Sequence, residues 1–165
     1  MEIREIEIED AKGLCDLIMQ VDSESPFMLF GEGERNLKTE QMEQRIEGAK
    51  KEENSTIFVA EDKDKLVGYL MVIGGSARKN RHSVYLVCGI IKDYRGQGVG
   101  TRLFTKLNEW VIINKISRIE LTVASSNQAG LALYKKMGFE IEGTKRNSLL
   151  IDGEYVDEFY MSRLI

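Results

Sequence analysis

Cysteine, histidine and proline are scarce in this sequence, and their scarcity removes several kinds of site. The 165 residues include two cysteines, one histidine and one proline. Cys15 and Cys88 lack the spacing of metal ligands and need no disulfide, so we expect no metal site. We expect both to be small buried residues that stay reduced, as in a cytoplasmic protein. His82 follows Arg81 in a polar stretch, and we expect it to be solvated rather than catalytic.

Long hydrophobic runs and a surplus of positive charge are also missing. No run reaches the roughly 20 apolar residues of a membrane helix, and residues 1–8 do not resemble a signal peptide. The chain has 23 Lys and Arg against 27 Asp and Glu, a net charge of −4. We therefore expect neither a nucleic-acid nor a membrane partner. An anionic cofactor would need a local binding site, because the overall field does not attract it.

The length and composition predict one ordinary globular domain, residues 1–165. The hydrophobic fraction of 42% and the charged fraction of 30% are typical of such a domain. In the first half, residue patterns predict a short edge strand over 3–8 and a helix capped by Asp10 that runs to about Gln20. A loop over 23–35 contains Pro26. A helix over Thr39–Lys51 and strands over 56–60, 66–73 and 84–91 follow.

A glycine-rich turn after the strand over 84–91 is the most informative feature of the chain. Gly96, Gly98 and Gly100 alternate with other residues and lead into a helix whose apolar side includes Leu103 and Leu107. A strand, a glycine turn and a helix start together present free backbone N–H groups to a phosphate. Glycine suits this place because a Cβ would keep the phosphate away from the backbone.

The spacing of these glycines shows which of the known kinds of phosphate-binding loop this turn can be. Thr101 stands where the dinucleotide pattern G-x-G-x-x-G has its third glycine, and no Lys-Ser or Lys-Thr pair follows Gly100. Together with Arg95, the stretch Arg-Gly-Gln-Gly-Val-Gly resembles the pyrophosphate loop of the GCN5-related N-acetyltransferases, which bind acetyl-CoA. A nicotinamide-dependent reductase is a rival that would need the glycine loop after the first strand of a parallel unit.

A second block, residues 119–139, resembles the same family. It reads as a strand, then Asn127, then a helix that ends in Leu-Tyr-x-x-x-Gly-Phe at Phe139. The two blocks lie in the family's order and spacing, and the resemblance covers nearly the whole chain, though it is weaker before Ile57. It implies an α/β fold with a mixed central sheet and helices on both faces. Three antiparallel strands, a parallel strand–helix–strand unit and a final hairpin at Asp152-Gly153 fit this fold.

The resemblance also implies how acetyl-CoA binds and reacts. The backbone of the strand would pair with the pantetheine arm where it diverges from its neighbour, and Gly89 in an otherwise β-branched run predicts a bulge or a close backbone approach. Tyr134 would protonate the leaving thiolate, and an amide of Gly89 or Ile90 would stabilise the oxyanion. The amine would attack directly, without an acyl-enzyme at Cys88. The cofactor-binding residues are then Cys88, Gly89, Ile90, Arg95, Gly96, Gln97, Gly98, Val99, Gly100, Thr101, Asn127 and Tyr134.

The base and the acceptor site are less defined. Some relatives have a glutamate two residues before Ala124, where this chain has Thr122. Glu120, on the same side of the strand, could act through water, although a surface carboxylate is its simpler role. Rim residues proposed for the amine are Glu24, Phe27 and Asp157, beside Glu158. Two alternatives stay open: a non-catalytic acyl-CoA sensor, and a homodimer formed through the C-terminal strand.

Overall fold

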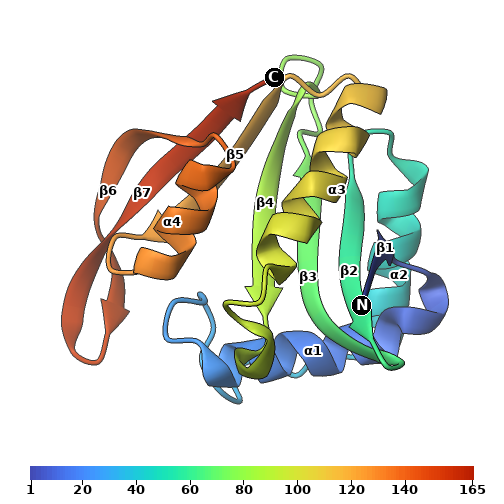
Figure 1. Ribbon diagram of the computed structural model, residues 1–165, viewed down its shortest axis with the longest axis horizontal. Helices are drawn as coiled ribbons and strands as arrows, with labels where there is room; N and C mark the ends of the chain where they lie inside the picture. Colours follow the sequence, from blue (N-terminus) through green and yellow to red (C-terminus); the bar gives the residue numbers. More distant parts are fainter.

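The computed structural model of the chain describes all 165 residues as one mixed sheet with helices on both sides (Figure 1). No helix is both long enough and apolar enough to cross a membrane. Two short 3-10 helices lie at Ile8–Asp10 and Lys92–Tyr94. The other elements are β1 (Glu2–Glu5), α1 (Ala11–Glu24), α2 (Thr39–Lys51), β2 (Thr56–Asp62), β3 (Lys65–Gly74), β4 (Ser83–Ile90), α3 (Val99–Ile113), β5 (Arg118–Ala124), α4 (Gln128–Lys136), β6 (Glu140–Ile151) and β7 (Glu154–Leu164).

The sheet has seven strands in the order β1-β2-β3-β4-β5-β7-β6. All neighbours are antiparallel except β4 and β5, which are parallel. The predicted edge strand, antiparallel meander and parallel unit are therefore confirmed, as is the fold class. A parallel connection needs a crossover, and α3 supplies it.

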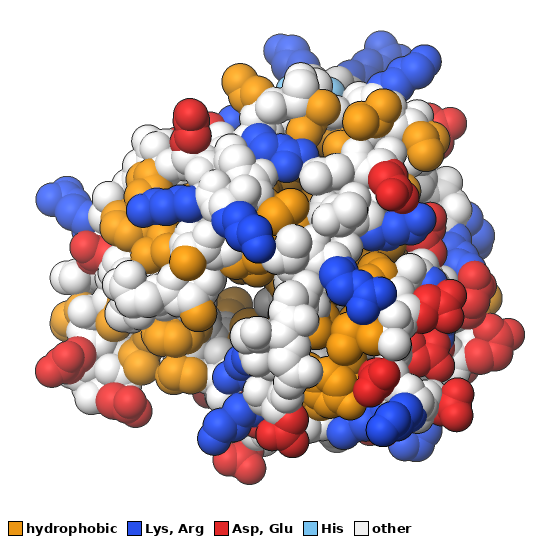
Figure 2. Space-filling view, viewed as in Figure 1, with side chains coloured by type: hydrophobic (Ala, Val, Ile, Leu, Met, Phe, Trp, Pro, Cys, Tyr) orange, Lys and Arg blue, Asp and Glu red, His pale blue; other side chains and the backbone are white.

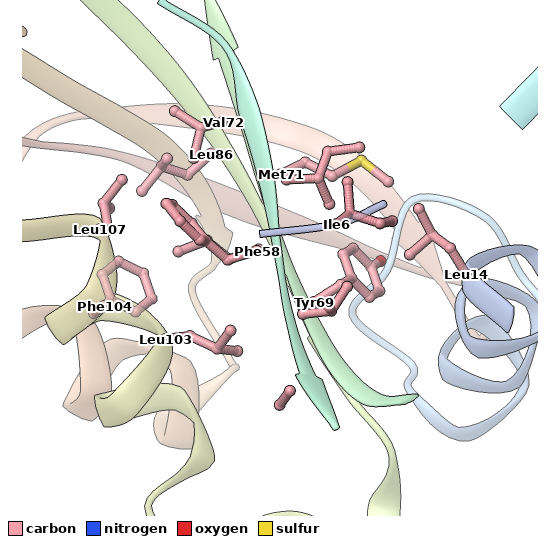
Figure 3. Packing of buried hydrophobic residues seen from close by; sticks show 14 of the residues in the cluster. Ile6, Leu14, Phe58, Tyr69, Met71, Val72, Leu86, Leu103, Phe104 and Leu107 are labelled. Atoms are coloured by element: carbon pink, nitrogen blue, oxygen red, sulfur yellow. The ribbon is translucent and has the colours of Figure 1, made fainter. Parts of the chain in front are cut away.

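One hydrophobic core runs through both faces of the sheet. Phe58, Leu86 and Leu107 pack on the α3 side, while Tyr69 and Leu14 pack on the α1 side (Figure 3). Alternation of side chains along each strand produces this division, since successive residues point to opposite faces. The α3 face continues into α4, because the ring of Phe104 lies 5.8 Å from that of Tyr134. The two helix layers hold the sheet rigidly around the site.

The pairing of β4 with β5 stops after three residues. Ser83 to Tyr85 pair with Arg118 to Glu120, and beyond them the strands separate. The reason is that β5 pairs along its whole length with β7, so it follows the β6–β7 hairpin away from β4 (Figure 1). Residues 86–90 therefore have no neighbour on one side, as the resemblance implied.

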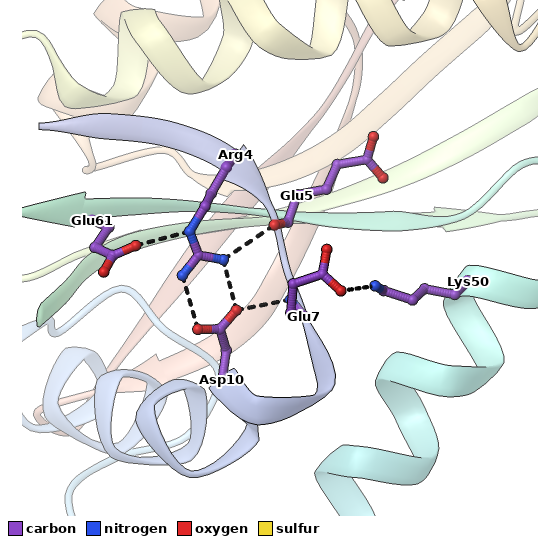
Figure 4. A network of polar contacts seen from close by, with 6 residues as sticks. All are labelled: Arg4, Glu5, Glu7, Asp10, Lys50 and Glu61. Carbon is purple, nitrogen blue, oxygen red and sulfur yellow. Dashed lines mark hydrogen bonds and ion pairs between the residues drawn. The ribbon is translucent and has the colours of Figure 1, made fainter. Parts of the chain in front are cut away.

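The N-terminus differs from the prediction. The first strand ends at Glu5 instead of residue 8, and the side chain of Asp10 does not cap α1. Its carboxylate instead accepts hydrogen bonds from the Arg4 guanidinium at 2.7 and 2.9 Å and from the Glu7 N–H at 2.8 Å (Figure 4). Arg4 also bonds Glu61 on β2. The two-sided guanidinium is a stronger partner than a helix amide, and it lowers the pKa of Asp10.

The C-terminal strand lies inside the sheet and not at its edge. β7 pairs with β6 over 154–162 and with β5 over 158–164, so its first residues have a partner on one side only. The dimer through this strand stays a prediction. The hairpin turn itself is confirmed, since Asp152 and Gly153 have φ values of 50° and 79°. The register of β6 against β7 is irregular between Lys145 and Leu149, so the strand has two regularly paired parts.

Candidate active site

A cavity of about 710 Å³ fills the gap between β4 and β5. In the space-filling view it opens as a hollow left of the centre, bordered mostly by hydrophobic side chains (Figure 2). Its wall has two parts. The helix half lies on the α3 and α4 side and consists of Gly96, Gly98 to Thr101, Asn127, Ala129, Gly130, Leu133, Tyr134 and Lys136. The loop half consists of residues 25–30, Arg35, Tyr85, Thr122 and Glu158.

The glycine turn provides the N–H groups of the helix half. Gly96 and Gly98 have φ values of 71° and 79°, which other residues rarely adopt. Gly98 is the N-cap of α3, and the first helical bond is Arg102 N–H to its carbonyl at 3.0 Å. The amides of Val99, Gly100 and Thr101 therefore have no helical partner, and these residues line the cavity. This arrangement suits a phosphate at the positive end of the helix dipole.

Charged and polar side chains near the turn have different positions from those predicted. Arg95 lines the cavity but donates to the carbonyls of Ile90 at 2.9 Å and Glu24 at 3.3 Å. Gln97 lies outside the lining and donates to the Asp93 carbonyl at 2.5 Å. The cation that the sequence reading missed is Lys136, whose Nζ lies 3.4 Å from the Thr101 hydroxyl. Lys136 is the last residue of α4, and its place beside the glycine turn depends on how α4 packs against α3, which its position in the chain does not reveal.

The free edge of β4 exposes backbone groups of alternate residues. Ile91 N–H donates to the Val67 carbonyl on β3, so odd-numbered residues of this strand bond to β3. The amides of Cys88 and Ile90 consequently face the gap, whereas that of Gly89 faces β3. Of the two amides predicted for the oxyanion, only that of Ile90 points into the cavity.

Position 89 requires glycine for a reason that differs from the predicted bulge. The register between β3 and β4 is regular, so the predicted bulge is wrong. The close neighbour is a side chain and not the backbone that the alternative predicted: a Cβ on Gly89 would lie 2.5 Å from Cε1 of Tyr69. The Tyr69 ring covers the glycine from the opposite strand. Any larger residue here would displace that ring from the core.

Asn127 and Tyr134 lie at the two ends of α4. Asn127 is the N-cap, and its Oδ1 accepts the Gly130 N–H at 2.9 Å. Tyr134 is half-buried against Phe104 and Phe139, with ring centroids 5.8 and 6.0 Å away. Burial raises the pKa of the Tyr134 phenol, and the neighbouring Cys88 adds to the rise. The hydroxyl thus stays protonated in the cavity wall, as a proton donor must.

Cys88 is a poor nucleophile in this position. Burial raises the pKa of its thiol to about 12, because the thiolate would lose its hydration. No base is hydrogen-bonded to it, and the thiol of Cys15 lies buried on α1. A thiol nucleophile needs a lowered pKa or an adjacent base, and Cys88 has neither.

The loop half is held by a buried ion pair. Asp22 on α1 is 4% exposed, and both of its oxygens accept from Arg35 at 2.8 and 2.9 Å. The guanidinium also lies 4.4 Å from the centre of the Phe30 ring. Phe27 belongs to this wall, as predicted. The apolar loop therefore packs over the gap, instead of serving only as a cover for the core.

The predicted base Glu120 is outside the cavity. Its carboxylate accepts from Arg118 at 2.9 Å, and the same guanidinium bonds both oxygens of Glu142 on β6. Thr122 does line the cavity, where its hydroxyl is 2.8 Å from that of Tyr85. Arg118 thus links β5 to Glu142 of β6, and Glu120 holds the Arg118 guanidinium within β5. No motif in the sequence pointed to Tyr85.

The three acidic residues predicted at the rim have different positions in the structure. Glu24 accepts from the Lys92 N–H at 2.6 Å and from Gln20, which joins the end of α1 to the turn before α3. These bonds lower its pKa. Asp157 lies outside the cavity lining, and its Oδ1 accepts the Asn147 N–H of the β6 irregularity at 2.8 Å. Glu158, one residue further along β7, is the acid that lines the cavity.

Comparison with known proteins identifies the family. A model of the acetyltransferase (GNAT) family matches residues 18–139. The chain belongs to this family. An acetyltransferase of the GNAT family from Streptococcus pneumoniae superposes with a TM-score of 0.95 and 30% identity, covering 99% of this chain and 98% of that one.

One further sequence and one further solved structure are similar to this GNAT chain. The L-amino acid N-acetyltransferase AaaT of Escherichia coli (strain K12) is 35% identical over 104 residues, which are 60% of this chain and 62% of that enzyme. The match thus spans less than two thirds of AaaT. The fold is also that of yncA from Salmonella typhimurium, described with its cofactor acetyl-CoA. Their TM-score is 0.87 at 16% identity, over 99% of this chain and 92% of that one.

Proposed function

We propose that this GNAT protein transfers the acetyl group of acetyl-CoA to a primary amine. The observation that carries the proposal is the position of the free β4 edge, the unpaired α3 amides and the Tyr134 hydroxyl around one cavity. A phosphate site, a strand edge for an amide-containing arm and a proton donor are the parts that this reaction needs. The family membership and a protein of the same fold with acetyl-CoA support the same reading.

Acetyl-CoA would lie along β4 in the helix half. The amides of Val99 to Thr101 would bind the pyrophosphate, with Lys136 as the nearest cation. The pantetheine amides would pair with the backbone of Cys88, because the Ile90 carbonyl already accepts from Arg95 and leaves only the Ile90 N–H free. Asn127 would contribute its amide nitrogen, because its Oδ1 is occupied by the N-cap bond.

The chemistry would be direct transfer. The amine nitrogen forms a bond to the acetyl carbonyl carbon, and the amide of Ile90 stabilises the negative charge on the oxygen. The bond from carbon to sulfur then breaks, and Tyr134 gives its proton to the thiolate. Cys88 takes no part, since its thiol stays protonated.

The acceptor would enter through the loop half, on the opposite face of the sheet from α3 and α4. The walls of Phe27, Phe30 and Arg35 fit a small amine, an amino acid or a protein N-terminus. Amino acids are the first acceptors to test, because AaaT is named for them. The free thiols of Cys15 and Cys88 suit a cytoplasmic enzyme.

The decisive experiment measures thiol release from acetyl-CoA with the twenty L-amino acids, alkyl amines and short peptides. We expect turnover with some acceptors, together with thermal stabilisation by acetyl-CoA. Tight acetyl-CoA binding without turnover on any amine would instead favour the sensor alternative. Stabilisation by NADH and not by acetyl-CoA would contradict both.

A further inference from the structure

Glu158 occupies a special position among the acidic residues of the chain. The chain has 27 Asp and Glu residues, and Glu158 is the one carboxylate among the residues that line the cavity. Its side chain is 14% exposed, and it belongs to β7. A carboxylate in a mostly hydrophobic cavity is costly to desolvate unless a partner of opposite charge comes to it.

The strand register places Glu158 at the level of the proposed oxyanion site. Ala124 pairs with Glu158 across β5 and β7. On the other side, Ser83, Val84 and Tyr85 pair with Arg118, Ile119 and Glu120. Continued across the gap, this register sets Ala124 level with Gly89, one residue from the free amide of Ile90.

Glu158 also points to the face of the sheet on which the acceptor would enter. Residues paired across neighbouring strands point to the same side, so Glu158 shares a face with Ala124 and with Thr122. Thr122 bonds Tyr85, which belongs to the loop half. Glu158 therefore lies where the acceptor would enter, whereas Tyr134 lies across the sheet with the cofactor. The two groups approach the reacting carbon from opposite faces.

The surroundings of Glu158 leave it free to bind a cation. Its one ion-pair partner is Lys145 on β6, at 3.9 Å, and that side chain is 49% exposed. The other charged side chains of the cavity wall are Arg35, Arg95 and Lys136. Arg35 is held by Asp22 and Arg95 by backbone carbonyls, while Lys136 lies beside the glycine turn.

We propose that Glu158 binds the ammonium group of the acceptor and is the base of the reaction; this rests on the proposed function. The ammonium nitrogen loses two protons when it becomes an amide. One passes to the Glu158 carboxylate and on to water, which frees the lone pair for attack. The other replaces, through solvent, the proton that Tyr134 gives to sulfur. No further reactant is needed.

Two isosteric variants of neighbouring residues test this role: Glu158→Gln and Asp157→Asn. Asp157 is a matched control, because it lies outside the cavity and an asparagine Oδ1 can still accept the Asn147 N–H. With the best amino acid of the wild type, we expect Glu158→Gln to lower kcat/KM at pH 7 by about a hundredfold. Asp157→Asn should stay within about twofold, and acetyl-CoA affinity should not change in either.

The pH dependence separates a base from a structural residue. The loss of kcat/KM in Glu158→Gln should shrink as the pH rises toward the pKa of the acceptor amine, because the amine then arrives already deprotonated. That pKa is about 8 for a peptide N-terminus and about 10 for an alkyl amine. Glu158→Asp should keep part of the activity. A deficit equal at pH 7 and pH 9.5, or equal activity of the two isosteric variants, would overturn the proposal for Glu158 alone. Absence of wild-type turnover on every amine would overturn the proposed function and this inference together.

Discussion

The two halves of the cavity are built from different materials. The helix half and the β4 edge beside it use mainly backbone groups, namely amides at the start of α3, the free edge of β4 and glycines with positive φ, with Tyr134 as the reacting side chain. The loop half uses side chains from distant parts of the sequence, among them Arg35, Tyr85 and Glu158. Backbone groups bind what all members of a family share, while side chains can be exchanged without altering the fold. The difference explains how one scaffold can keep its cofactor and vary its acceptor.

The largest effect should come from the helix half, at Tyr134. Tyr134→Phe removes the proton donor but keeps the ring that packs on Phe104 and Phe139. We expect kcat to fall by about a hundredfold or more, with the acetyl-CoA affinity unchanged. Steady-state thiol release and calorimetric titration measure the two quantities. Tyr155→Phe, at a residue 70% exposed, is the control. Unchanged kcat would remove Tyr134 as the acid.

The next effect concerns the loop half and its ion pair. Arg35→Leu leaves the buried Asp22 carboxylate without a partner, and we expect a loss of about 3 kcal/mol in the free energy of unfolding. KM for the amine should rise while acetyl-CoA affinity stays the same. Urea unfolding and steady-state kinetics check this, and adding Asp22→Asn should recover part of the stability.

A matched control for this pair lies on α1. Lys12 and Asp16 form an exposed ion pair at 2.8 Å. Lys12→Met should leave the free energy of unfolding nearly unchanged, because water screens an exposed ion pair. Equal losses from Arg35→Leu and Lys12→Met would show that burial of Asp22 has no energetic consequence.

Two glycines with positive φ compare the cofactor turn with a loop position outside the cavity wall. Gly98 and Gly33 have φ values of 79° and 76°, and no atom lies within 4 Å of a Cβ built on either. An alanine at either position should cost about 1–2 kcal/mol of strain. Gly98→Ala should also weaken acetyl-CoA binding by about tenfold, because the turn amides shift. Gly33→Ala should leave this affinity unchanged. Calorimetric titration of both variants decides whether the turn or general strain controls the affinity.

The smallest effect is expected at Cys88. Its thiol has a pKa raised to about 12, so thiolate forms only at high pH and is nearly absent at pH 8. Alkylation by iodoacetamide at pH 8 should be slower than that of a free thiol of pKa about 8.5 by on the order of a thousandfold. Peptide mapping by mass spectrometry measures it. Cys88→Ala should keep kcat within about twofold, and a large loss would point to an acyl-enzyme.

The sequence predicted the helix half well because its determinants are local. Three alternate glycines between a β-branched run and an amphipathic helix allow few other structures, and the turn at Gly96 to Gly100 formed as expected. The same holds for α2 and the Asp152-Gly153 hairpin. The positions of the Arg95 and Gln97 side chains could not be predicted in this way. Both donate to backbone carbonyls, and no sequence motif identifies those partners.

The acidic residues show what could not be predicted from the sequence. Glu24, Glu120, Asp157 and Glu158 were all candidates with a simple surface role as the alternative. Glu24 and Asp157 have bonds to Lys92 and Asn147 that join different elements, and Glu120 bonds Arg118 within β5. Which carboxylate faces the gap depends on the register of β7 against β5 and on the angle at which β5 leaves β4. A shift of one residue would exchange Asp157 and Glu158.

The sequence by itself thus determined the order of the elements, the phosphate turn and the tyrosine at the end of α4, since each depends on short-range pattern and backbone conformation. Only the tertiary structure decided the width of the β4–β5 gap, the free amide of Ile90, the clamp of Arg35 on Asp22 and the inward position of Glu158. Those features arise where strands and loops distant in the chain pack together. Their geometry is set by pairing and burial, which no local run of residues encodes.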